Sequence, residues 1–126
     1  MKITQLDHFV LTVKDIVKTT EFYQTILGMQ LEIFGDNRIC LKFANQKINL
    51  HQLGKEFEPK ALSPTPGSAD LCFITELDLI EAKQQIEAKG CPIIEGPVRR
   101  TGACCSLLSI YLRDPDGNLI EIANQL

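Results

Sequence analysis

Several features are scarce in this chain of 126 residues, and each scarcity excludes a class of protein. Histidine occurs only twice, as His8 and His51. Lys and Arg number 13 against 16 Asp and Glu, without a basic run, so no nucleic-acid partner is expected. No apolar stretch approaches the ~18 residues of a membrane-spanning helix, so no membrane partner is expected either.

The cysteines are five in number and show no Cys-x-x-Cys spacing. An odd count without that spacing favours reduced, buried thiols in a cytoplasmic protein over a disulfide framework. The adjacent pair Cys104-Cys105 is either a redox element or a pair of small residues packed around a turn. Polar residues interrupt the apolar run near the N-terminus, so no signal peptide is expected there.

The overall balance is 44% hydrophobic and 23% charged residues, which suits one globular domain over residues 1–126. Its first half begins with a strand-like run over 6–13. Asp15 then caps a helix whose apolar positions recur at helical spacing up to Gly28. Three further strand-like runs follow, at 29–34, 38–43 and 47–53. The first half therefore predicts a βαβββ module.

The second half repeats this order. A strand is expected at 69–75, a helix at 78–89, and three strands at 92–95, 107–113 and 119–123. Gly90 follows Gly28 by 62 positions, and Asp70 follows His8 by the same 62. Beyond the helix, the second half is about eight residues longer than the first, and residues 98–106 are the expected place of this insertion. Module one spans 1–54, a linker 55–68 and module two 69–126.

The fold class expected is α+β, with two tandem βαβββ modules forming curved mixed sheets around a metal-containing cavity. Each module offers one metal-binding residue type in its first strand and one in its last: His8 and His51, then Asp70 and Glu121. Two imidazoles and two carboxylates suit Mn, Fe, Co, Ni or Zn better than Ca or Mg. Each residue also has an explanation without a metal. The histidines can be packed residues of a strand, Glu121 can be solvated, and Asp70 can cap the start of a strand.

Other segments are expected to bind the substrate, to cover the cavity or to position Glu121. Arg99 and Arg100 lie in the inserted stretch and either clamp an anionic substrate group or belong to a solvated loop. Tyr111 is a third expected substrate contact. The segment 55–60 is a candidate lid. Residues 114–118, Asp-Pro-Asp-Gly-Asn, predict a tight turn that fixes the register of Glu121.

Three stretches carry a family resemblance: residues 7–13 (DHFVLTV), the helix end with Phe22-Tyr23 and Leu27-Gly28, and residues 114–121 (DPDGNLIE). Together they resemble the vicinal oxygen chelate superfamily of glyoxalases, bleomycin-resistance proteins and ring-cleaving dioxygenases. Residues 49–51, 57–61, 64–72 and 96–103 more narrowly resemble glyoxalase domain-containing protein 5 and lactoylglutathione lyase-like bacterial virulence proteins.

The resemblance implies a divalent metal at His8, His51, Asp70 and Glu121, with Glu121 as the catalytic base. It also implies a small substrate with vicinal oxygens, and a homodimer. Glyoxalase I has an Arg for a glutathione carboxylate where this chain has Thr12, so a glutathione adduct requires Arg99 or Arg100 instead. The alternatives are an Fe(II) dioxygenase that uses His8, His51 and Glu121, and a metal-free drug-binding protein.

Overall fold

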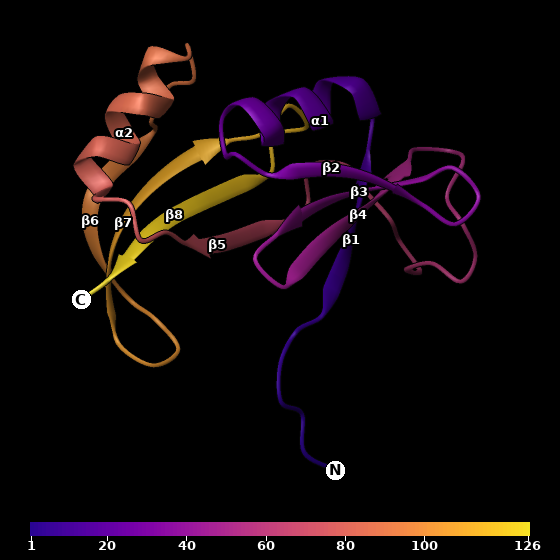
Figure 1. Cartoon of the computed structure of the whole chain (residues 1–126), viewed down its shortest axis with the longest axis horizontal. Helices are drawn as coiled ribbons and strands as arrows, with labels where there is room; N and C mark the ends of the chain where they lie inside the picture. Colours follow the sequence, from indigo (N-terminus) through magenta and orange to yellow (C-terminus); the bar gives the residue numbers. More distant parts are fainter. The chain divides into compact units, whose positions relative to one another are not determined.

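A computed structural model describes residues 1–126, which divide into two compact units, Met1–Pro66 and Gly67–Leu126. Figure 1 labels their elements. In chain order these are β1 (His8–Val13), α1 (Ile16–Thr25), β2 (Gln30–Phe34), β3 (Arg38–Phe43), β4 (Gln46–Gln52), β5 (Asp70–Ile74), α2 (Leu79–Ala88), β6 (Glu95–Thr101), β7 (Ser106–Arg113) and β8 (Leu119–Gln125).

The first unit is a four-stranded mixed sheet in the order β1-β4-β3-β2, with α1 packed against it. β1 runs parallel to β4, and the other two pairs are antiparallel. Asp15 begins α1 by accepting a hydrogen bond from the backbone N–H of Lys18, as the sequence predicts. The helix serves as the crossover that a parallel pair requires.

Strand periodicity gives this sheet two chemically different faces. One face carries the apolar core side chains Leu11, Val13, Leu41, Ile48 and Leu50. The other face carries Thr12, Asn49 and His51, which are also buried. Because successive side chains of a strand alternate between faces, these two sets cannot mix. Chemistry in this unit is therefore confined to the second face.

The second unit repeats the same topology, in the order β5-β8-β7-β6, with α2 packed against β7 and β8. Asp78 begins α2 by accepting hydrogen bonds from the N–H groups of Ile80 and Glu81. The buried helix residues are Leu79, Ala82 and Ile86. Two βαβββ modules are thus confirmed, each with its own mixed sheet.

The sequence placed one strand wrongly. It expected a strand over 92–95 followed by an inserted loop at 98–106, whereas β6 runs from Glu95 to Thr101 and contains Arg99 and Arg100. Pro97 conceals this strand, because proline lacks the N–H that a regular ladder needs. The register shifts between Glu95 and Val98, and this irregularity accommodates the proline.

The turn over 114–118 forms as predicted and is internally bonded. Asp114 accepts from the backbone N–H groups of Asp116 and Asn118 at 2.9 Å each. The Asn118 side chain donates to Asp114 at 2.7 Å and accepts from the backbone N–H of Ala69 at 2.9 Å. This buried asparagine therefore joins the start of β8 to the start of β5, and so fixes the level at which Glu121 lies.

The five cysteines are all free thiols, and Cys104 and Cys105 are not joined to each other. Neither α1 nor α2 is long and apolar enough to cross a membrane.

Candidate functional site

Glu121 lies in the middle of the second unit's sheet. Its register partners are Cys72 on β5 and Tyr111 on β7. Directly paired residues project from the same face of a sheet, so a thiol and a phenol flank the carboxylate. The Glu121 Oε1 atom is buried without a hydrogen-bond partner, and buried polar atoms of this kind are uncommon in proteins.

The neighbours of Glu121 respond electrostatically to its charge. Burial, reinforced by the Glu121 carboxylate, raises the pKa of the Cys72 thiol to about 11. Burial is also the main cause of the raised pKa of Tyr111, and Glu121 adds to it. Both groups are therefore protonated at neutral pH and can act as hydrogen-bond donors to Glu121.

Two of the predicted substrate contacts, Arg100 and Tyr111, lie together here. The Arg100 Nε–H donates to the Tyr111 hydroxyl at 2.9 Å, and Nη2 donates to Glu95 at 3.1 Å. Arg99 projects from the opposite face, because side chains alternate along β6, and contributes only its carbonyl, 3.0 Å from Arg100 Nη1. Arg100 is therefore already committed to protein groups.

A pocket of about 420 Å³ opens beside Glu121 within this unit. That volume suits a small molecule. It is lined by Cys72, Ile74, Arg100, Thr101, Gly102, Ala103, Cys104, Cys105, Leu107, Glu121 and Gln125.

Asp70 projects from the same face of the sheet as Glu121. Its register partner is Leu119, two residues before Glu121, so the two carboxylates are diagonal neighbours with Cα atoms about 7–8 Å apart. Asp70 is exposed, and its charge contributes to the raised pKa of Cys72. The two acidic residues thus form one pair of oxygen donors.

The first unit carries an equivalent position that the sequence did not single out. Glu121 lies opposite Cys72, and Cys72 is two residues after Asp70 on β5. In the same way, Asn49 lies opposite Val10, and Val10 is two residues after His8 on β1. Asn49 is only 5% exposed, and its side-chain oxygen Oδ1 has no hydrogen-bond partner. The register counterpart of Glu121 is therefore Asn49 rather than His51.

His8 is exposed at the start of β1. Its Nδ1 lies 2.7 Å from a carboxylate oxygen of Asp7. A carboxylate in this position holds the Nδ1–H tautomer and leaves Nε2 free, the arrangement that metal-binding histidines commonly use. His8 is thus the better prepared of the two imidazoles for a metal.

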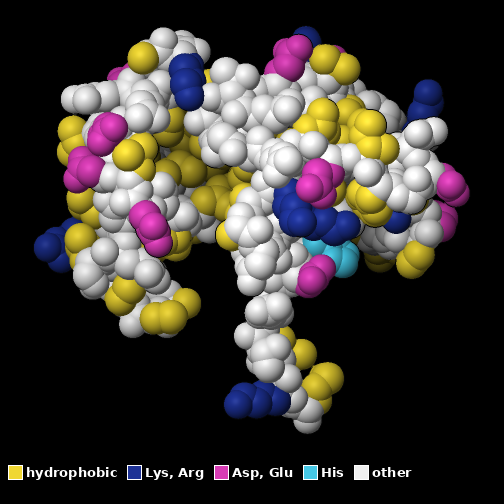
Figure 2. All heavy atoms as spheres, viewed as in Figure 1, with side chains coloured by type: hydrophobic (Ala, Val, Ile, Leu, Met, Phe, Trp, Pro, Cys, Tyr) yellow, Lys and Arg dark blue, Asp and Glu magenta, His cyan; other side chains and the backbone are white.

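His51 is 3% exposed and has a different environment. Its Nε2 lies 3.3 Å from the Arg38 guanidinium, which can only donate, so this nitrogen accepts. Burial lowers the pKa of His51, and the Arg38 charge lowers it further. Phe57, in the predicted lid segment, packs edge-on against the imidazole, with 5.6 Å between the two ring centroids. The guanidinium carbon of Arg38 lies 4.7 Å from the centroid of the Phe57 ring. Figure 2 shows basic and acidic side chains beside the histidine surface visible from that side, which is coloured by residue type alone.

The two histidines do not come together. His8 pairs with Lys47 and His51 pairs with Thr12, so they are four residues apart along parallel strands. At ~3.3 Å per residue this separation is about 13 Å, too far for two imidazoles bound to one ion. The His8–His51–Glu121 triad expected for an Fe(II) dioxygenase is therefore not supported.

The remaining donors fit a metal in pairs. Within either unit no three His, Cys, Asp or Glu side chains are grouped closely enough to hold an ion. Each unit instead presents two donors on register-equivalent positions: His8 and Asn49 in the first, Asp70 and Glu121 in the second. Asn49 in the first unit and Glu121 in the second each have a buried oxygen without a hydrogen-bond partner.

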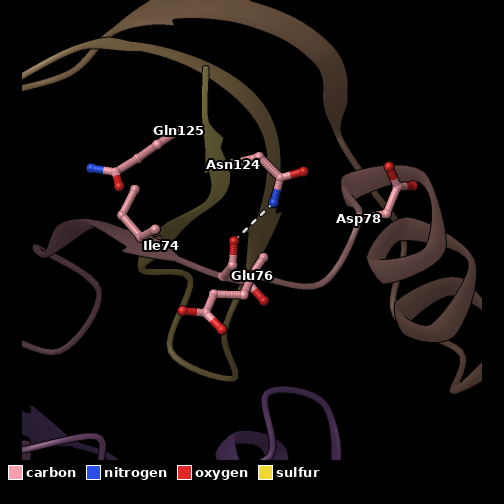
Figure 3. A pocket seen from close by; sticks show the side chains of 6 residues that line it. Ile74, Glu76, Asp78, Asn124 and Gln125 are labelled. Atoms are coloured by element: carbon pink, nitrogen blue, oxygen red, sulfur yellow. Dashed lines mark hydrogen bonds between the residues drawn. The ribbon is translucent and has the colours of Figure 1, made fainter.

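A second hollow, of about 480 Å³, lies where β5 and β8 meet the start of α2. Figure 3 shows Ile74, Glu76, Asp78, Asn124 and Gln125 around it. The Asn124 amide donates to the carbonyls of Thr75 and Leu77, and its oxygen accepts from the N–H of Leu79. This asparagine therefore holds the loop before α2 in place.

Comparison with known proteins identifies the family. The model of the Glyoxalase/Bleomycin resistance protein/Dioxygenase superfamily matches residues 5–122. This chain belongs to that superfamily. It is 56% identical to virulence protein STM3117 of Salmonella typhimurium, over 98% of this chain and 85% of that protein. It is 52% identical to the glyoxalase domain-containing protein RDO1 of Mycosarcoma maydis, over 98% of this chain and 70% of that protein.

Solved structures agree with this assignment. The crystal structure of STM3117 has a TM-score of 0.99 to this chain, with 100% of both chains covered. Two distant structures share the fold alone. One is an antibiotic-binding protein, TnmS3 of Streptomyces sp. CB03234 (22% identical, TM-score 0.75, 100% and 99% covered). The other is a lactoylglutathione lyase of Agrobacterium tumefaciens, which is 20% identical and has a TM-score of 0.74, with 98% of this chain and 96% of that chain covered.

Proposed function

We propose that this chain is a metal-dependent lyase or isomerase of the glyoxalase type, acting on a small substrate with vicinal oxygens. The single observation that carries the proposal is the Glu121 carboxylate. It borders a pocket of about 420 Å³, it is flanked by Cys72 and Tyr111 on the neighbouring strands, and its Oε1 has no protein partner. A fixed carboxylate with one uncommitted oxygen suits both a metal ligand and a general base.

The donors proposed for a metal are Asp70 and Glu121 in the second unit and the register-equivalent His8 and Asn49 in the first. Asn49 takes the place that the sequence gave to His51, because its oxygen is partnerless and its register matches Glu121. A bound Mn, Fe, Co, Ni or Zn ion would polarise the substrate oxygens and acidify the adjacent C–H bond. Glu121 then carries the proton from one carbon to its neighbour. Asp7 orients His8 for its role.

Glutathione recognition by an Arg on β1 is not part of the proposal. The corresponding residue is Thr12, which is buried opposite His51. Arg100, the replacement considered from the sequence, is paired with Glu95. A small vicinal-oxygen compound therefore suits this chain better than a large anionic conjugate. The homodimer expected from the resemblance remains part of the proposal, and sedimentation equilibrium tests it.

The test is proton exchange and isomerisation of 2-oxoaldehyde hemithioacetals by the metal-loaded chain, with the thiol varied. We expect Glu121→Gln to lower kcat at least 100-fold while the chain stays folded. Glu76→Gln, which changes an exposed glutamate of the same unit, is the matched control and should keep full activity. Full activity of Glu121→Gln would contradict the proposal. Saturable binding of the hemithioacetal without turnover would indicate a ligand-binding protein instead.

A further inference from the structure

We propose that Arg100 and Tyr111 are positioning residues that act on Glu121 as a hydrogen-bonded relay, rather than residues that bind an anionic substrate. The inference rests on the proposed function, in which Glu121 moves the proton. It is carried by the hydrogen bonds of Arg100 to Glu95 and to Tyr111, and by the direct cross-strand pairing of Tyr111 on β7 with Glu121 on β8.

The direction of the relay follows from the chemistry of its members. A guanidinium can only donate hydrogen bonds, so the 2.9 Å contact between Arg100 Nε and Tyr111 makes the phenol oxygen an acceptor. The phenol proton is then left to donate elsewhere. Glu121, the register partner of Tyr111, is the acceptor on that side. Arg100 thereby orients the Tyr111 O–H toward the carboxylate.

Arg100 itself is fixed from three directions. Its Nη2 donates to Glu95 at 3.1 Å, its Nη1 donates to the Arg99 carbonyl at 3.0 Å, and its guanidinium carbon lies 5.4 Å from the Tyr111 ring centroid. The Glu95 carboxylate also balances its charge. An arginine with its charge balanced and its donors engaged is poorly suited to a substrate carboxylate and well suited to holding a neighbour still.

Cys72 completes the arrangement from the opposite strand. It is the register partner of Glu121 on β5. Tyr111 and Cys72 therefore flank the carboxylate on both sides, while Oε1 keeps no protein partner. Flanking groups of this kind restrain a carboxylate, which lowers the reorganisation needed for proton transfer.

The relay is tested without activity by carbon-13 NMR of the Glu121 side-chain carboxyl in the metal-free chain. The variants are Arg100→Gln, Tyr111→Phe and the two combined, with Arg113→Gln as the control. Arg113 also projects from β7, two residues after Tyr111 on the same face, but contacts the Gly117 carbonyl instead. We expect Arg100→Gln and Tyr111→Phe each to shift the Glu121 resonance, and Arg113→Gln to leave it in place.

The combined variant decides whether the effect passes through Tyr111. In the Tyr111→Phe background, Arg100→Gln should cause no further shift. An equal shift in both backgrounds would show a direct charge effect and overturn the relay. An unmoved resonance in Tyr111→Phe would overturn it as well. These outcomes do not depend on the chain being an isomerase.

Kinetics separate the relay from anion binding and from failure of the proposed function. If isomerase activity is present, Arg100→Gln and Tyr111→Phe should lower kcat about 10- to 100-fold with little change in KM. A rise in KM with unchanged kcat would assign Arg100 to substrate binding and overturn the relay. If no variant or parent shows activity while the NMR shifts appear as expected, the relay stands and the proposed function fails.

Discussion

Asn49 and Glu121 occupy the same register position in the two units. Asn49 lies opposite Val10 and Glu121 lies opposite Cys72, and Val10 and Cys72 are each the third residue of the first strand of their unit. Each also has a buried oxygen without a hydrogen-bond partner. Each sheet therefore carries an unsatisfied oxygen acceptor at the same point of its register. Since such groups are costly unless paired, both positions point to an external partner.

This equivalence predicts which residue of the first unit affects metal binding. Replacing Asn49 with Leu should weaken Co²⁺ binding at least tenfold, because an oxygen donor is lost. Replacing His51 with Gln should leave Co²⁺ affinity unchanged, since His51 accepts from Arg38 and lies about 13 Å along the strands from His8. Isothermal titration calorimetry measures both. A large loss in His51→Gln and none in Asn49→Leu would restore His51 as the ligand.

The environment of His51 predicts how stability depends on pH. Burial and Arg38 lower its pKa in the folded chain below the ordinary 6.5. As pH falls below about 6.5, the unfolded chain binds a proton that the folded chain does not, so the free energy of unfolding decreases. The decrease ends below the folded pKa, where both states are protonated.

Urea unfolding of the metal-free chain at several pH values measures this effect, with His51→Gln as the comparison. The variant should lose less stability than the parent between pH 7 and pH 5. Arg38 and Lys60 oppose protonation of His51 and Glu56 favours it, so these charged groups set the size of the effect. An identical pH dependence in parent and variant would contradict the assignment.

The contact between Cys72 and Glu121 predicts slow alkylation of an exposed thiol. With a pKa of about 11 instead of 9.0, Cys72 is almost entirely protonated at pH 8. After allowing for the greater nucleophilicity of its thiolate, its reaction with iodoacetamide should be roughly tenfold slower than that of an unperturbed thiol. Glu121→Gln should accelerate the reaction. Peptide mass spectrometry measures the rate of Cys72 alkylation. An unchanged rate in Glu121→Gln would contradict the contact between Cys72 and Glu121.

Asn118 should contribute strongly to stability. Its side chain is 1% exposed and bonds both Asp114 and the Ala69 N–H. Asn118→Ala leaves those buried groups unpaired, so we expect a loss of about 1–3 kcal/mol in the free energy of unfolding. Thermal and urea denaturation measure it. Asn45→Ala, at an exposed turn, is the control and should change stability little.

Most of the fold could be predicted from the sequence because it is encoded locally. Asp15 and Asp78 cap the helices, and the 62-residue offset indicated the duplicated module before any contact was known. The strand over 95–101 was missed for an equally local reason. Pro97 interrupts the strand pattern, and only pairing with β7 across a register shift makes this segment a strand.

The site was only partly predictable because register is not a local property. Asn49 and His51 are two residues apart, so they share one face of β4 and no periodicity distinguishes them. The choice depends on pairing between β1 and β4, which lie far apart in the sequence. Cys72 and Arg38 were overlooked for the same reason, since their importance comes from the residues opposite them. Glu121 stands out in the sequence because a charged residue between two isoleucines is conspicuous.

The most direct test is a calorimetric titration of the metal-free chain with Ni²⁺ or Co²⁺, compared with Glu121→Gln and the control Glu76→Gln. We expect saturable binding to the parent chain and to Glu76→Gln, with the affinity of Glu121→Gln reduced at least tenfold because a charged oxygen donor is lost. No binding to the parent chain, or equal binding to Glu121→Gln, would contradict the proposal that Glu121 holds a catalytic metal.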